Sequence, residues 1–157
     1  MKIDFALREL HRAEGALVRD LLGLAERHRA EHEVHHVARD LAEWSRRHVG
    51  ELAAAGADHG LRLDPDPPGR PGPLVAALRE PGLRRTDPGL ILLADLRRLH
   101  RATAGVSLDW ELLAQGAQAV KNGELLELAG RCHPQTLRQL KWTNAMLKTL
   151  SPQILAS

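Results

Sequence analysis

The fold is decided by the stretch LRLDPDPPGRPGPLVAALREPGLRRTDP, residues 61–88, which holds seven of the nine prolines of this 157-residue chain. Proline lacks the backbone N–H that a helix interior needs, so the stretch cannot be one continuous helix. Its middle, PLVAALRE at residues 73–80, is predicted to form one short helical turn. A connection as long as a helix lets the chain return along a bundle. The helices before and after it are therefore predicted to run parallel.

Apolar residues recur at helical spacing before this connection, in two successive stripes. The second stripe is out of phase with the first by about one residue near RAEHE, residues 29–33, which predicts a tight polar turn there. The first stripe contains Ile3, Leu7, Leu10, Leu17, Leu21 and Leu24, and the second contains Val34, Val37, Leu41, Trp44, His48 and Leu52.

Helix ends are marked by familiar residue types after the connection. Asp87 and Pro88 suit a helix N-cap and first helical position. Lys121-Asn122-Gly123 is predicted to end that helix. Pro134 is expected to kink or split the last helix, and Pro152 to follow its end. The helices are thus predicted at about residues 3–29, 33–59, 89–121 and 124–150.

These elements predict an all-α fold in a single domain, residues 1–157: a four-helix bundle made of two antiparallel hairpins joined by a long Pro/Gly-rich crossover at about residues 61–88. Tryptophans 44, 110 and 142 lie near the core stripes and are predicted to serve packing. Small residues between 114 and 119 predict a close helix approach, either within the bundle or across a dimer.

Composition excludes several classes of protein. The only cysteine is Cys132, so an intrachain disulfide and a four-cysteine zinc site are both excluded. The net charge of +2 comes from interleaved acidic and basic residues, which gives no indication of a nucleic-acid partner. No apolar run approaches the roughly 18 residues that span a bilayer, and MKIDFALREL is not a signal peptide. We therefore expect a cytoplasmic protein without membrane or nucleic-acid partners.

Two polar residues occupy positions in the apolar stripes where a leucine would be expected. Glu14 on the first helix and His48 on the second lie at about equal distances from the predicted turn. Both should therefore face the core at the same height, as neighbours. His11 is a third candidate for this layer. Counting along the other two helices to the same height adds His100 and His133.

This arrangement resembles the ferritin-like superfamily, in which a bundle with one long crossover holds two iron ions. Glu14 matches the carboxylate of the first helix, but Ser45 stands three residues before His48, where that family has a glutamate. The third helix offers His100 and Thr103 instead of a glutamate. The stretch CHPQTLRQL, residues 132–140, lacks a Glu-x-x-His motif. The resemblance therefore implies a bundle without a complete di-iron centre, and by analogy a homodimer.

Two interpretations of the polar layer remain open. Glu14 and His48 can form a buried structural pair in a non-catalytic structural or interaction protein with no cofactor and an unidentified protein partner. Alternatively, Glu14, His48, His100 and His133 can bind a single metal ion, iron or zinc, for redox or storage chemistry. The sequence does not decide whether the protein is an enzyme.

A further group of histidines lies at the first turn, in ERHRAEHEVHH at residues 26–36. The four-residue spacing of His32 and His36 suits metal chelation on a helix. The group is predicted instead to be a solvated turn whose histidines, 28, 32, 35 and 36, serve as capping and helix-end residues.

Overall fold

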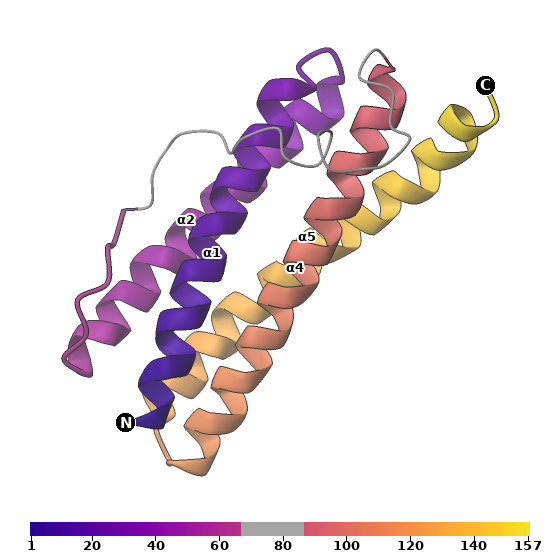
Figure 1. Cartoon of the computed structure of the whole chain (residues 1–157). Helices are drawn as coiled ribbons and strands as arrows, with labels where there is room; N and C mark the ends of the chain where they lie inside the picture. Colours follow the sequence, from indigo (N-terminus) through magenta and orange to yellow (C-terminus); the bar gives the residue numbers. More distant parts are fainter. Residues whose placement is uncertain (67–86) are drawn as a thin grey trace.

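The computed structural model describes residues 1–66 and 87–157, which form four helices and no strand. The helices are α1 (Lys2–Arg27), α2 (His32–Asp58), α4 (Pro88–Ala119) and α5 (Gly123–Leu155). They confirm the all-α class, and they are arranged as a four-helix bundle (Figure 1). None of these helices is both long enough and apolar enough to cross a membrane.

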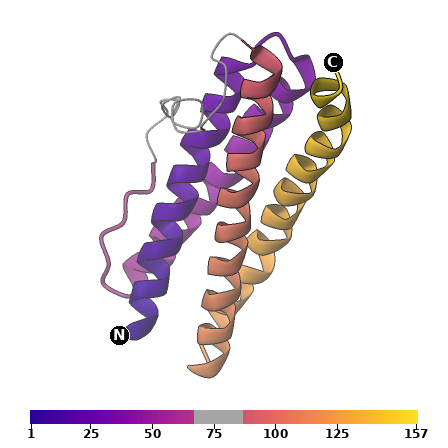
Figure 2. The ribbon, with the colours of Figure 1, turned by 45° about the vertical axis from the view of Figure 1, so that its right-hand side comes forward.

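Helix α1 packs against α2 and α4, and helix α5 packs against α4 and α2. Figures 1 and 2 show α1 and α5 running in one direction and α2 and α4 in the other. The predicted parallel course of α2 and α4 is therefore confirmed. Most of the connection between them, including the helical turn predicted at residues 73–80, lies outside the described residues.

The chain folds back along α2 directly after that helix ends. The backbone carbonyl of Asp64 lies 2.6 Å from His11 Nε2 on α1. A Cβ on Gly56 would lie only 2.8 Å from the Cδ1 atom of Leu63, so glycine leaves room for this return. The first residues of the predicted crossover thus pack against the α1–α2 pair.

The first turn and the start of α4 agree with the predictions. Residues 28–31 connect α1 to α2, where a polar turn at residues 29–33 is predicted. The carboxylate of Asp87 caps α4 by accepting a hydrogen bond from the backbone N–H of Leu90 at 3.1 Å, and Pro88 is the first helical residue. Sequence patterns identify these two ends because both depend on local backbone chemistry.

Helix α4 ends within two residues of the stop predicted at Lys121-Asn122-Gly123. Helix α4 already ends at Ala119, and Lys121 adopts a left-handed backbone conformation with φ of 58°. The backbone N–H of Asn122 donates to the carbonyl of Ala117 at 2.8 Å and so closes α4. Asn122 also starts α5, because its side-chain oxygen accepts a hydrogen bond from the N–H of Leu125 at 3.1 Å. An asparagine can serve either role, so Asn122-Gly123 alone does not distinguish the end of a helix from the start of one.

The predicted effects of the two prolines on α5 are also corrected. The helix is continuous from Gly123 to Leu155 and contains both Pro134 and Pro152. Pro134 is exposed, as is Gly130, whose carbonyl loses its usual helical partner at this proline. Water can therefore satisfy that carbonyl, and the helix continues past the proline on its solvent side.

The core lies between the apolar stripes of all four helices. Trp110 is completely buried, and Trp44 and Trp142 pack against the core, which confirms the packing role predicted for the tryptophans. The small residues of α4 serve close approach within the bundle. Ala117 is fully buried, and a Cβ on Gly116 would lie 3.8 Å from Ile3 of α1.

Candidate functional site

Glu14 of α1 and His48 of α2 are direct neighbours in the middle of the bundle. The Nδ1 atom of His48 lies 2.6 Å from Oε2 of Glu14, and both side chains are at most 1% exposed. Each residue lies on the buried stripe of its helix, and the short α1–α2 turn sets their common height. The predicted contact between the two is confirmed.

Two further side chains complete this polar layer, so that every helix contributes one residue. Trp110 of α4 donates its indole N–H to the same Oε2 of Glu14 at 3.0 Å. Gln135 of α5 places its Oε1 atom 2.7 Å from Nε2 of His48. The indole and imidazole rings meet edge to face, with centroids 5.8 Å apart. Sequence patterns predict neither Trp110 nor Gln135 as a partner in this layer.

The surroundings of His48 favour its charged form. Burial, the largest influence, opposes the charge, but the hydrogen bond and negative charge of Glu14, together with the hydrogen bond to Gln135, outweigh it. The pKa of His48 is therefore raised above its usual value. Both ring nitrogens face oxygen acceptors, which is the arrangement that an imidazolium with two N–H donors requires.

This raised pKa predicts how stability depends on pH. A proton bound more tightly by the folded chain stabilises the fold fully below the unfolded pKa of about 6.5, and this contribution is lost as the pH rises through the folded pKa. Urea unfolding of the wild type should therefore show a stability decrease on the alkaline side of pH 6.5. A His48→Gln variant should lack that decrease, and an equal decrease in both proteins would assign it to other groups.

Ser45, three residues before His48, belongs to a neutral hydrogen-bonded pair. The amide nitrogen of Gln139 on α5 donates to Ser45 Oγ at 2.9 Å and to the carbonyl of Leu41 at 3.0 Å. Ser45 and Gln139 are both buried. A hydroxyl and an amide thus satisfy each other in the core beside His48.

The other two candidate metal ligands have partners of their own. His100 donates from Nδ1 to Thr143 Oγ1 at 2.8 Å, and His133 shares a 2.8 Å hydrogen bond with Ser107. Within residues 1–66 and 87–157, no three His, Cys, Asp or Glu side chains lie close enough together to hold a metal ion. The structure brings together Glu14 and His48 of the four candidates, and the metal site that they would form remains a prediction.

The height predicted for the third helix is wrong by one to two turns, for a physical reason. Arg27, at the end of α1, binds Asp95, whereas α4 already begins at Pro88. Helix α4 therefore extends past the α1–α2 turn before it reaches the bundle. If both helices are assumed to start at the same level, the count ends near Thr103 to Val106, although Trp110 is the residue beside Glu14.

The prediction of a solvated first turn is wrong for His28 and is confirmed for His32 and His36. His28 is buried, and its Nε2 atom lies 2.8 Å from Oδ2 of Asp95 on α4. His35 does serve a helix end, because its Nδ1 atom lies 2.8 Å from the carbonyl of Ala25. His32 and His36 are exposed, with ring centroids 6.4 Å apart. The turn thus combines a buried ion pair with a surface pair of histidines.

Asp95 is the centre of that buried ion pair. Its Oδ2 atom accepts from His28 and from Nε of Arg27, which lies 2.9 Å away. Burial, the largest influence, acts to raise the pKa of this carboxyl, but the hydrogen bonds from His28 and Arg27 outweigh it and lower the pKa. The pair fastens the end of α1 to the second turn of α4.

A shallow groove between α2 and α5 connects the buried layer to the surface. It has a volume of about 490 Å³, and its lining includes His48, Gln135, Glu51 and Cys132. The thiol of Cys132 donates to Oε2 of Glu51 at 3.2 Å. Burial, followed by the hydrogen bond to Glu51, raises the pKa of Cys132, so it remains a protonated thiol and not a nucleophilic thiolate.

Comparisons with known proteins identify no family for this chain. No protein-family model matches the chain, and neither a curated protein nor a solved structure shows significant similarity to it.

Proposed function

We propose that this chain is a ferritin-like four-helix bundle without a complete di-iron centre, and that it acts as a non-catalytic structural or interaction protein. The observation that carries this proposal is the hydrogen-bonded layer of Glu14, His48, Trp110 and Gln135. In this layer, the side chains that would bind metal are used to bind each other. A homodimer, as the ferritin-like resemblance implies, is part of the proposal.

The chemistry of the layer supports a structural role. Oε2 of Glu14 accepts from two N–H donors, and both nitrogens of His48 are engaged. A metal ion could reach His48 only by displacing Glu14 or Gln135. Buried polar groups that contact all four helices can fix the relative heights of those helices without any reaction.

One observation favours the alternative of a mononuclear metal site. The second carboxylate oxygen of Glu14, Oε1, is buried and has no hydrogen-bond partner among the described residues. A buried acceptor without a partner is costly, and a bound cation would satisfy it. Glu14 and His48 would then hold the ion, and iron or zinc would supply Lewis-acid or redox chemistry at that place.

Elemental analysis of protein purified without a histidine tag distinguishes the structural role from the mononuclear metal site. We expect less than about 0.1 equivalent of any transition metal per chain, even after reconstitution, because Oε2 of Glu14 and both ring nitrogens of His48 already have partners. About one equivalent that disappears in both Glu14→Gln and His48→Gln, but not in the surface control Glu43→Gln, would establish the alternative. Metal lost only in a His32→Ala/His36→Ala variant would be surface chelation.

A further inference from the structure

Three large apolar side chains lie exposed on the side of α1 and α4 that faces away from the core. Phe5, the only phenylalanine of the chain, is 69% exposed, and Leu108 and Leu112 are 60% and 65% exposed. Phe5 lies about two and a half helical turns before the buried Glu14, so it points to the opposite side of α1. Leu108 and Leu112 lie two residues to either side of the buried Trp110, so they point to the opposite side of α4. Helices α1 and α4 lie side by side (Figures 1 and 2), and we call the surface with these three side chains the α1–α4 face.

Contacts between α1 and α4 fix which residues of the two helices lie at the same height along this face. A Cβ on Gly116 would lie 3.8 Å from the side chain of Ile3, and Arg98 lies 4.0 Å from Asp20. The helices run in opposite directions, and the two contacts agree on the pairing of heights to within one residue. Counting five residues along each helix, from Ile3 and from Gly116, brings positions 8 and 111 level.

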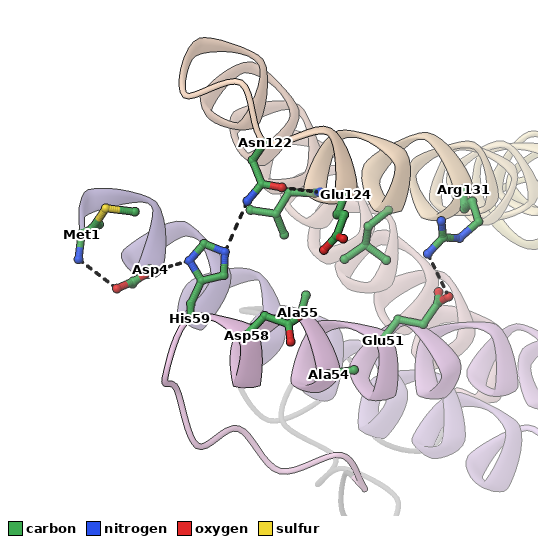
Figure 3. Close-up of a pocket in the computed structure, with 12 residues that line it drawn as sticks. Met1, Asp4, Glu51, Ala54, Ala55, Asp58, His59, Asn122, Glu124 and Arg131 are labelled. Carbon is green, nitrogen blue, oxygen red and sulfur yellow. Dashed lines mark hydrogen bonds and ion pairs between the residues drawn. The ribbon is translucent and has the colours of Figure 1, made fainter.

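The residues at these positions carry opposite charges on opposite edges of the face. Arg8 follows Asp4 by one turn, and Asp4 binds His59 at the end of α2 at 3.3 Å (Figure 3), so Arg8 lies at the α2 edge. Glu111 follows Ser107 by one turn, and Ser107 bonds to α5 at 2.8 Å, so Glu111 lies at the α5 edge. Both are exposed, and neither forms an ion pair within the described part of the chain.

This arrangement complements a second copy of itself. In a two-fold symmetric pair every contact occurs twice, with the roles of the two chains exchanged. A two-fold axis perpendicular to the face, at the height of Arg8 and Glu111, places Arg8 of one chain opposite Glu111 of the other. Phe5 and Leu108 each precede these residues by three positions, on antiparallel helices. The same axis therefore places Phe5 of one chain on Leu108 of the other, with Leu112 beside the axis.

We propose that the α1–α4 face binds a second copy of this chain across that axis, with Phe5 packed on Leu108 and Arg8 paired with Glu111. The inference rests on the homodimer of the proposed function and names its interface. Nucleic acid or an anionic membrane fits the face less well, because Glu111 matches the charge of Arg8. Three large apolar side chains per copy suit an interface at the small end of the range for specific complexes, so the dimer should be weak.

Sedimentation equilibrium of the full chain, from about 1 µM to about 1 mM, tests the proposal. We expect a monomer–dimer equilibrium with a Kd of about 50 µM. Phe5→Ser should weaken it about tenfold, whereas Leu137→Ser, at an exposed leucine of α5, should leave it unchanged. Both positions are on the surface, so the helix content measured by circular dichroism should stay that of the wild type.

Reversal of the two charges tests the two-fold arrangement itself. Arg8→Glu and Glu111→Arg should each weaken dimerisation at least about tenfold, because each places two like-charged contacts in the pair. An equimolar mixture of these two variants should dimerise about as tightly as the wild type, because both contacts then join opposite charges. Arg39→Glu, at an exposed position of α2, is the matched control and should not change the Kd.

The possible failures are distinguishable. A dimer that the Phe5 and charge-reversal variants leave intact would overturn this interface but not the homodimer of the proposed function. A chain that is still monomeric at about 1 mM would overturn both. Equal losses in the control variants, or no recovery in the mixture, would also overturn the interface. Metal found at the buried layer by elemental analysis would overturn the non-catalytic role and would leave the dimer contacts unaffected.

Discussion

Replacement of Glu14 by alanine is expected to lower the free energy of unfolding by about 3–5 kcal/mol, the range typical when one member of a buried ion pair is removed. The reason is the geometry around its Oε2 atom, which accepts from both His48 and Trp110. Both N–H groups would be left buried without an acceptor, and the truncated side chain would leave a cavity between α1 and α4.

Glu14→Gln is the matched variant, because the amide oxygen can still accept from His48 and Trp110. It removes the negative charge, so His48 is expected to become neutral, and the loss should be only about 1 kcal/mol. Glu43→Ala, at an exposed position of α2, should stay within about 0.5 kcal/mol of the wild type. Urea unfolding at neutral pH gives all three values. A loss below about 1 kcal/mol for Glu14→Ala would show that the layer does not stabilise the bundle.

The contact between Glu14 and His48 could be predicted because it depends on one short turn. A hairpin fixes the heights of its two helices, so the position of each residue relative to the turn was enough. Trp110 could not be placed in the same way. Its height depends on how far α4 extends past the α1–α2 turn, and the long connection before α4 leaves that distance undetermined.

Other buried polar residues could have been recognised from the sequence, but a search for metal ligands overlooks them. Asp95 and Gln139 both lie on the buried stripes of their helices, as Glu14 does. A polar residue at such a position requires a partner, whatever its type. Gln135 gave no such signal, because it lies only partly buried beside the stripe of α5 and is recognised through its contact with His48.

The second large effect is expected at Asp95, where replacement by alanine should lower the free energy of unfolding by about 2–4 kcal/mol. The carboxylate is 1% exposed and accepts from both Arg27 and His28. Without it, two cationic or polar side chains at the end of α1 lose their shared acceptor. The effect should be smaller than at Glu14, because Arg27 is 16% exposed and can be partly hydrated.

Asp109→Ala, on the same helix, is the matched control. Burial and the nearby charge of Glu9 raise the pKa of Asp109, so its charge does not stabilise the fold, and its removal should cost less than about 0.5 kcal/mol.

The pH dependence of stability identifies the cause of the loss at Asp95. Because the pKa of Asp95 is lowered in the folded chain, its contribution is present above the unfolded value of about 3.9 and is lost as the pH falls through the folded pKa. Urea unfolding from pH 7 downward should therefore show the wild type and Asp95→Ala converging in acid. A constant difference between them would assign the loss to packing instead of to the ion pair that joins α1 to α4.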